Sequence, residues 1–184
     1  MLTAWGDESG SQPDRDPGTY IVAAALIEEE DVEAVRKTMH DLLLPTETKV
    51  HWHGSSPERR QKLVEVVLGL PVCSVIVVHN DPAANERRRR RKCLEHLFPQ
   101  LTHMSCGEVT FESRGTMDAS DLDILQKFRA RKLAPAGMRL HHMKGRIEPV
   151  LSVADVVCGA LVQARVGNPV YLQQLGGLVD IHQI

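Results

Sequence analysis

Residues 19–27, TYIVAAALI, form a nearly continuous apolar run that is rich in β-branched residues. A run of this length and composition predicts a buried strand. Only the polar segment 9–18, with two prolines and two glycines, separates it from the apolar start of the chain. A loop this short cannot make the crossover that parallel strands require. The first two strands are therefore predicted to pair antiparallel.

The composition predicts a globular protein. The chain has 184 residues, of which 42% are hydrophobic and 25% charged, enough for one domain over residues 1–184. The net charge of −2 provides no global field toward nucleic acid or membrane, so any electrostatic partner must bind a local patch. The four cysteines form no CxxC pair, and no leader sequence or membrane-length apolar run is present. We expect a soluble, cytoplasmic protein with no membrane partner.

The remaining segments alternate between helix and strand patterns. Acidic residues 28–31 open a predicted helix over 31–44, and Ser56-Pro57 begins a second over 57–68, so about 28–70 is predicted to be a helical insertion. Further strands are predicted at 72–79, 108–113 and 138–143, and further helices at 83–98, 120–132 and 150–165. This order predicts an α/β fold, a mixed sheet whose later strands run parallel to the first and whose faces are covered by helices.

Three acidic residues interrupt apolar sequence: Asp7 at the predicted end of the first strand, Glu112 in VTFESR, and Asp155 in SVADVVCG. If the first strand and 108–113 are parallel neighbours, Asp7 and Glu112 emerge at one sheet edge, where the last helix can bring Asp155. Two like charges about 4 Å apart cost about 4 kcal/mol at an effective dielectric of about 20, so either one carboxylate takes a proton or a cation lies between them. Oxygen ligands favour Mg²⁺ or Mn²⁺. Adjacent strand residues point to opposite faces, which leaves Glu8 a supporting or solvent-facing role.

These features together resemble domain-of-unknown-function family 3800, whose members have an RNase H-like fold. The resemblance lies in Asp7-Glu8-Ser9-Gly10 after the first strand, in Glu112 at the end of a middle strand, and in the segment Leu151-Ser152-Val153-Ala154-Asp155. That last segment is similar to the family's Leu-Gln-x-Ala-Asp motif, with Ser152 in place of Gln. Glu112 stands where Asp is more common. The resemblance spans nearly the whole chain, although each motif is short.

The resemblance implies a metal-dependent nuclease or phosphodiesterase. Asp7, Glu112 and Asp155 would hold one or two Mg²⁺ or Mn²⁺ ions, supported by Glu8. A fourth acid, Glu95 or Asp123, is expected from the fold. Lys144, and after it Lys49, are the candidates to balance charge on the phosphate.

The segment ERRRRRK, residues 86–92, carries six consecutive cations. Arg87, Arg90 and Arg91 fall on the helix side of the apolar residues and would snorkel along the core edge. The run predicts contacts to a phosphate backbone through Arg87, Arg88, Arg90 and Arg91, with Lys49 as a further contact. A solvated helix face and a docking surface for an acidic partner are equally compatible with it.

Two other functions stay open at this point. An RNase H-like binding or adaptor module would keep the fold without a complete metal site. A zinc-dependent hydrolase would use the histidines of His51-Trp52-His53 and of His141-His142. The apolar C-terminal segment 171–184 allows a homodimer or another protein partner. Nucleotide-binding GxxxxGK[ST] and GxGxxG motifs are absent.

Overall fold

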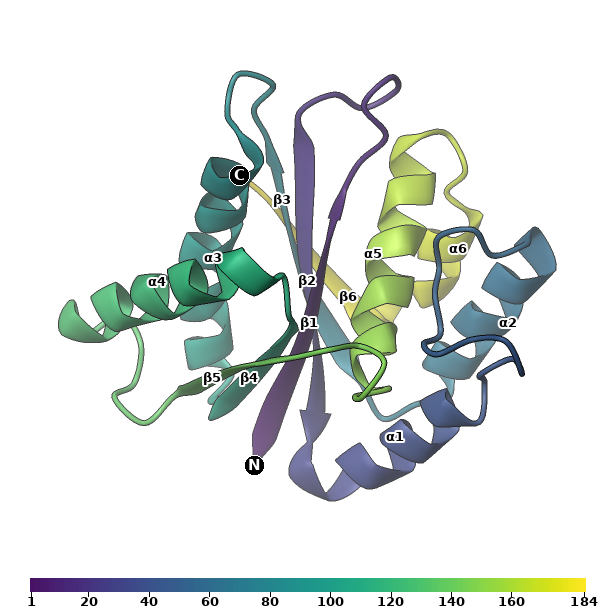
Figure 1. The fold of residues 1–184 in the computed structure, drawn as a ribbon, viewed down its shortest axis with the longest axis horizontal. Helices are drawn as coiled ribbons and strands as arrows, with labels where there is room; N and C mark the ends of the chain where they lie inside the picture. Colours follow the sequence, from purple (N-terminus) through teal and green to yellow (C-terminus); the bar gives the residue numbers. More distant parts are fainter.

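The computed structural model describes all residues 1–184 and contains six strands and six α-helices (Figure 1). The strands are β1 (Leu2–Gly10), β2 (Thr19–Glu28), β3 (Cys73–Asn80), β4 (Glu108–Glu112), β5 (Arg139–Met143) and β6 (Val179–Gln183). The helices are α1 (Val32–His40), α2 (Pro57–Leu68), α3 (Glu86–His103), α4 (Asp118–Ala130), α5 (Leu151–Arg165) and α6 (Val170–Leu175).

The six strands form one mixed sheet in the order β5-β4-β1-β2-β3-β6. The pairs β1/β2 and β2/β3 are antiparallel, whereas β1/β4, β4/β5 and β3/β6 are parallel. The predicted α/β fold is confirmed, including the antiparallel first pair and the parallel neighbours β1 and β4.

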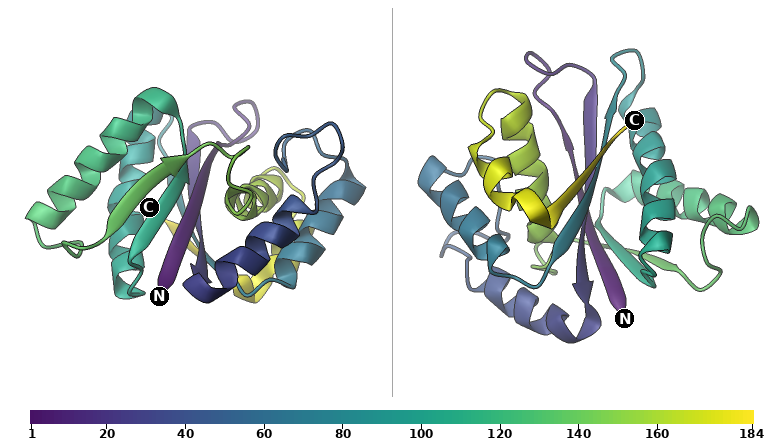
Figure 2. Two further views of the ribbon diagram at one scale, coloured as in Figure 1. Left: turned by 60° about the horizontal axis from the view of Figure 1, so that its bottom comes forward. Right: turned by 180° about the vertical axis from the view of Figure 1, so that it is seen from behind.

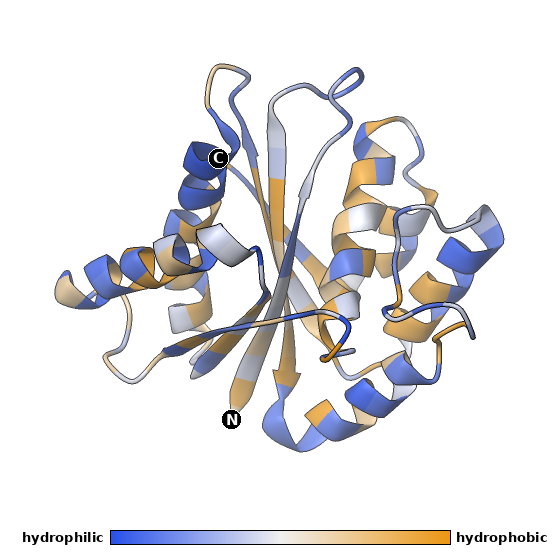
Figure 3. Ribbon diagram, in the orientation of Figure 1, coloured by the Kyte–Doolittle hydropathy of each residue, from blue (hydrophilic) through white to orange (hydrophobic).

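The sheet is buried on both faces because its two sides carry separate helical layers. Figures 1 and 2 show α1, α2, α5 and α6 on one side of the sheet and α3 and α4 on the other. Along β2, Ile21, Ala23 and Ala25 enter the core beneath α5, while Val22 and Ala24 enter the core beneath α3. This division explains why the segment 19–27 has no polar alternation. Figure 3 shows the apolar residues along the central strands and α5, with hydrophilic residues at the start of α3.

Several elements differ from the sequence prediction, among them α1, which ends at His40 and not at residue 44. β1 continues to Gly10, so Asp7 lies inside the strand and does not end it. α3 passes through Pro99 and ends at His103, beyond the predicted boundary at residue 98. The C-terminal segment adds the unpredicted strand β6, which pairs with β3 at the edge of the sheet. No helix of the structure has both the length and the hydropathy needed to cross a bilayer.

The close packing of β1 on β4 can be tested at Gly6. A Cβ atom at Gly6 would overlap the ring of the fully buried Phe111, whereas a Cβ atom at Gly10 of the same strand meets nothing within 4 Å. We therefore expect Gly6→Ala to lower the free energy of unfolding by about 1–3 kcal/mol, the usual effect of overpacking a core. Urea unfolding measures it, with Gly10→Ala as the control. Equal losses in both variants would contradict the packing of Phe111 over β1.

Candidate active site

Asp7 and Glu8 are adjacent in β1 and therefore face opposite sides of the sheet. Asp7 lies on the α5 side with Trp5, and Glu8 lies on the α3 side with Ala4. Both residues are only 7% exposed. The solvent-facing alternative predicted for Glu8 is wrong, because the strand continues past it and buries each carboxylate in a different core, whereas its supporting role stays a prediction.

On the α5 side, Asp7, Glu112 and Asp155 gather around Lys49; these three carboxylates are called the acid cluster below. The ammonium Nζ of Lys49 lies 3.9 Å from Oδ2 of Asp7 and donates a hydrogen bond to Oε2 of Glu112. Oδ2 of Asp155 accepts a hydrogen bond of 2.9 Å from the backbone N–H of Trp52. Segments 1–10, 45–56, 108–112 and 151–165 thus contribute to one site.

The topology explains why these residues meet. The parallel register of β1 and β4 pairs Gly6 with Phe111, which leaves Asp7 and Glu112 next to each other in the two strands. Gly159, one helical turn after Asp155, permits the ring of Trp52 to lie against α5, since a Cβ atom there would overlap the ring. Gly145 similarly leaves room for the pair formed by Lys49 and Glu112.

The acid cluster has too few positive charges. Burial raises the pKa of Asp7 well above its usual range, and repulsion from Asp155 raises it further, while Lys49 acts in the opposite direction. Burial also raises the pKa of the Asp155 carboxyl. Burial lowers the pKa of the Lys49 ammonium, but the neighbouring carboxylates raise it by more, so Lys49 stays protonated. Three ionised carboxylates and one ammonium leave a formal charge of −3 + 1 = −2, which one divalent cation would neutralise.

The donor set suits Mg²⁺ or Mn²⁺, since it consists of carboxylate oxygens with an uncompensated charge. The spacing of a formed metal site is not present: no group of three or more His, Cys, Asp or Glu side chains lies close enough to hold an ion. The ammonium of Lys49 contacts Asp7 and Glu112 instead. Lys49 is therefore buried against the acid cluster, and its predicted contact with nucleic acid stays a prediction.

On the α3 side, Arg90 neutralises Glu8. Its guanidinium is 2% exposed, donates bonds of 3.0 and 2.6 Å to Asp121, and donates another to Glu8. Arg114 lies 2.8 Å from Glu8, and His142 lies 3.0 Å from Asp121. Although burial opposes it, the bonds from His142 and Arg90 hold the pKa of Asp121 below its usual range. The predicted phosphate contact through Arg90 is therefore wrong.

The other predicted residues lie apart from the acid cluster. Arg87, Arg88 and Lys144 are exposed, and Arg91 is exposed and pairs with Glu95. Arg90 alone of the basic run is buried, so Arg87 and Arg91 do not snorkel along the core. The proposed fourth acids are also wrong. Glu95 and Asp123 lie on α3 and α4, across the sheet from Asp7.

The histidines suggested as zinc ligands do not gather in one place. His51 and His53 are exposed in the loop before α2. His141 lies 3.7 Å from Glu108, whereas His142 is bonded to Asp121 on the α3 side. The donors of a tetrahedral zinc site are therefore not assembled.

A pocket of about 400 Å³ opens beside Asp155. Trp52, His53 and Arg60 line one part of it, and the β1–β2 loop lines another. The guanidinium of Arg60 lies 5.3 Å from the ring centroid of Trp52. One carboxylate of the acid cluster is thus accessible to a ligand that also contacts a cationic side chain.

Comparison with known proteins relates the chain to ribonucleases H by fold. No family model matches it, so membership of family 3800 stays a prediction, and no curated protein matches it. The structure of the PCNA:RNase HII complex from Archaeoglobus fulgidus is similar with a TM-score of 0.62 and 14% identity, over 90% of this chain and 75% of that one. Ribonuclease H2 from Pyrococcus horikoshii OT3 is similar with a TM-score of 0.58 and 13% identity, over 96% of this chain and 76% of that one. Bst-RNase HIII in complex with Mn²⁺ is similar with a TM-score of 0.51 and 10% identity, over 96% of this chain and 54% of that one.

Removing Arg90 tests the network on the α3 side. We expect Arg90→Met to destabilise the protein by about 3–5 kcal/mol, because it leaves two buried carboxylates without their shared cation. Arg88→Met removes the same charge from an exposed position of the same helix and should change the stability by less than about 0.5 kcal/mol. Urea denaturation measures both. Similar stabilities would show that Arg90 is not needed to compensate Glu8 and Asp121.

Replacing Asp7 by Asn should stabilise the protein at neutral pH. Because the folded-state pKa of Asp7 is raised, its ionised form opposes folding, and the stability of the wild type increases as the pH falls through that pKa. We therefore expect a gain in stability at pH 7 that shrinks with falling pH, because protonation removes the buried charge of the wild type as well. Asp123→Asn, on the exposed side of α4, is the control. A loss of stability at pH 7 would mean that Lys49 compensates Asp7 fully.

Proposed function

We propose that this protein is a divalent-cation-dependent nuclease or related phosphodiesterase acting on nucleic acid, with Asp7, Glu112 and Asp155 holding Mg²⁺ or Mn²⁺. The supporting observation is the convergence of three carboxylates from distant segments around a single ammonium. With all three carboxylates ionised, the acid cluster would carry two negative charges in excess of its one ammonium in a largely buried place. A divalent metal ion would remove this surplus.

When bound, the ion supplies an activated water and stabilises the leaving oxygen of a phosphodiester. The chain's own residues prepare the site. The N–H of Trp52 orients Asp155, and the pair with Lys49 fixes Glu112. Lys49, once released from Glu112, has an ammonium within reach of a phosphate at the cluster. Arg60 and His53, which line the adjacent pocket, are placed to contact the substrate backbone.

The fold similarity supports the nucleic-acid class of substrate. The similar structures are described as ribonucleases, and one of them is a complex with Mn²⁺. At 10–14% identity the likeness is one of fold. The proposal therefore depends on the acid cluster of this chain. Arg87 and Arg88 would add a nonspecific attraction for phosphates from the α3 side.

One observation favours a second function, that of an RNase H-like binding module without catalysis. The hydrogen bond between Lys49 and Glu112 places a resident cation in the acid cluster, and no three acids have metal spacing. A binding module does not need a metal ion, so it could keep the hydrogen bond between Lys49 and Glu112 permanently.

Cleavage and metal binding together distinguish the two functions. The purified protein is incubated with labelled RNA, DNA and RNA–DNA hybrid in Mg²⁺, in Mn²⁺ or in a chelator. We expect metal-dependent cleavage that falls by more than about 100-fold in Asp7→Asn and Asp155→Asn, since even indirect partners of metal ligands cost about 10–100-fold. Asp123→Asn, with its exposed carboxylate, is the matched control.

The binding of Mn²⁺ is measured on the same proteins by calorimetry. Binding should be present in the wild type and in the control and be lost in Asp155→Asn. Nucleic-acid binding without cleavage in either metal, unchanged in the Asp variants, would overturn the nuclease and establish the binding module.

A further inference from the structure

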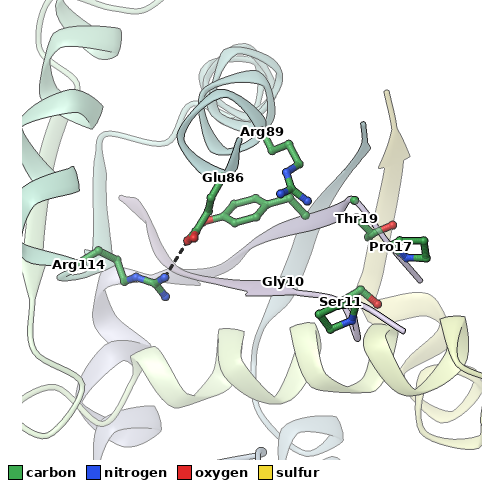
Figure 4. A pocket seen from close by; sticks show the side chains of 10 residues that line it. Gly10, Ser11, Pro17, Thr19, Glu86, Arg89 and Arg114 are labelled. Atoms are coloured by element: carbon green, nitrogen blue, oxygen red, sulfur yellow. Dashed lines mark hydrogen bonds and ion pairs between the residues drawn. The ribbon is translucent and has the colours of Figure 1, made fainter. Parts of the chain in front are cut away.

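A second pocket lies on the other side of the β1–β2 loop from the pocket that contains Asp155. It has a volume of about 410 Å³ and is lined by Tyr20, Glu86, Arg89, Arg114 and the loop ends (Figure 4). Both pockets include Gly10, Ser11 and Pro13, so they are separated only by the loop itself. This second pocket contains none of the acid cluster and none of the residues predicted from sequence.

Three polar groups that line this pocket are buried and lack a hydrogen bond of standard geometry within the protein, although Ser11 interacts with the carboxylate of Asp16 and Tyr20 with the guanidinium of Arg90. They are Oγ of Ser11, the hydroxyl of Tyr20 and Nε of Arg89. Ser11 is 8% and Tyr20 2% exposed, so neither residue has free access to bulk water. A buried polar group without a hydrogen bond costs about 1–3 kcal/mol, and three such groups at one place indicate a missing ligand.

The charges of the pocket favour an anion. Arg89 forms no ion pair, whereas Arg114 is paired 3.0 Å from Glu86 and 2.8 Å from Glu8. Figure 4 shows Arg89 extending from α3 toward Thr19, away from the pair formed by Arg114 and Glu86. Arg114 is shared between Glu86 and Glu8, so the guanidinium of Arg89 is the cation of this pocket that has no carboxylate within 4 Å. The pocket also lies at the first turn of α3, the end of a helix that favours negative charge.

The ligand needs several acceptor oxygens in a small volume. A guanidinium and two hydroxyl groups approach it from different elements: Arg89 from α3, Tyr20 from β2 and Ser11 from the loop. A tetrahedral phosphate presents acceptors in several directions, and a guanidinium forms strong charge-assisted hydrogen bonds with it.

We propose that this pocket binds a phosphate group of the nucleic-acid strand whose neighbouring phosphodiester lies at the acid cluster. The inference rests on the proposed function and deepens it, because it assigns a second contact point to the same strand. The strand would pass over the β1–β2 loop at Gly10 and Ser11, the residues common to the two pockets. Binding here would hold the substrate in a fixed register relative to Asp7 and Asp155.

The test measures binding in the Asp7→Asn background, so that cleavage does not enter. Fluorescence anisotropy is recorded with a labelled single-stranded oligonucleotide, and thermal stabilisation is recorded with inorganic phosphate and with a nucleoside monophosphate. We expect Arg89→Gln to weaken oligonucleotide binding about tenfold and to abolish the stabilisation by phosphate. Tyr20→Phe, which removes only the hydroxyl, should weaken oligonucleotide binding about threefold. Arg88→Gln is the charge-matched comparison: this exposed neighbour on α3 lines a different pocket and contributes only nonspecific attraction, so its loss should weaken oligonucleotide binding less than the loss of Arg89.

The outcomes separate this proposal from the proposed function. Equal weakening by Arg88→Gln and Arg89→Gln would reduce the effect to general charge attraction and overturn the site. Binding of inorganic phosphate or the monophosphate without any effect of Arg89→Gln on the oligonucleotide would overturn the strand as ligand. Loss of cleavage in Asp7→Asn with the Arg89 effect intact supports both proposals. If Arg89→Gln weakens oligonucleotide binding but the protein cleaves no substrate, the phosphate site is supported and the proposed nuclease activity is overturned.

Discussion

The structure depends on the alternation of side chains along β1, a strand that is buried on both faces and nevertheless carries Asp7 and Glu8 in succession. A period of two places one carboxylate in each core. A buried charge must be paired or it destabilises the fold by several kcal/mol. Each face of the sheet therefore requires its own cation, and the chain supplies Lys49 on the α5 side and Arg90 on the α3 side.

The two faces solve this requirement differently. On the α3 side, Arg90 binds both Glu8 and Asp121, and Arg114 binds both Glu8 and Glu86, so two guanidinium groups serve three carboxylates. On the α5 side one ammonium faces three carboxylates. A side that is only structural has no reason to retain this surplus of charge. The imbalance, and not the fold alone, distinguishes the α5 side as the place where chemistry is proposed.

The sequence predicted the fold better than the site. Because segment 9–18 is short, the first two strands were correctly predicted to be antiparallel. Because helices separate the later strands, these strands were correctly predicted to run parallel to the first. Asp155 could be identified because it interrupts an apolar helix, and its approach to Asp7 follows from the contact of α5 with β1. Strand β6 was missed since five residues with half-exposed side chains carry little periodic signal.

The positions of the compensating cations could not be predicted. Arg90 is one of six consecutive cations, and only the packing of α3 on the sheet determines that this one faces Glu8. Asp121 has an ordinary helix-start sequence, so its role appears only when Arg90 is buried against it. Lys49 lies in an irregular segment between α1 and α2, where no periodicity indicates which side chain turns inward. Tertiary contacts determine which of these side chains face the buried carboxylates, and local sequence patterns do not predict such contacts.

Lys49 has a physical role that follows from the two states of the acid cluster. Without a metal ion its ammonium limits the repulsion among the carboxylates, and its flexible stem allows it to leave Glu112. A divalent ion bound by the same oxygens would add two positive charges and, together with the ammonium, complete the neutralisation. The displaced ammonium would then lie beside the ion, where a phosphate with negative oxygens offers it a new partner. Under the proposed function, the cation that limits the repulsion among the carboxylates is thus also the one that would contact the substrate.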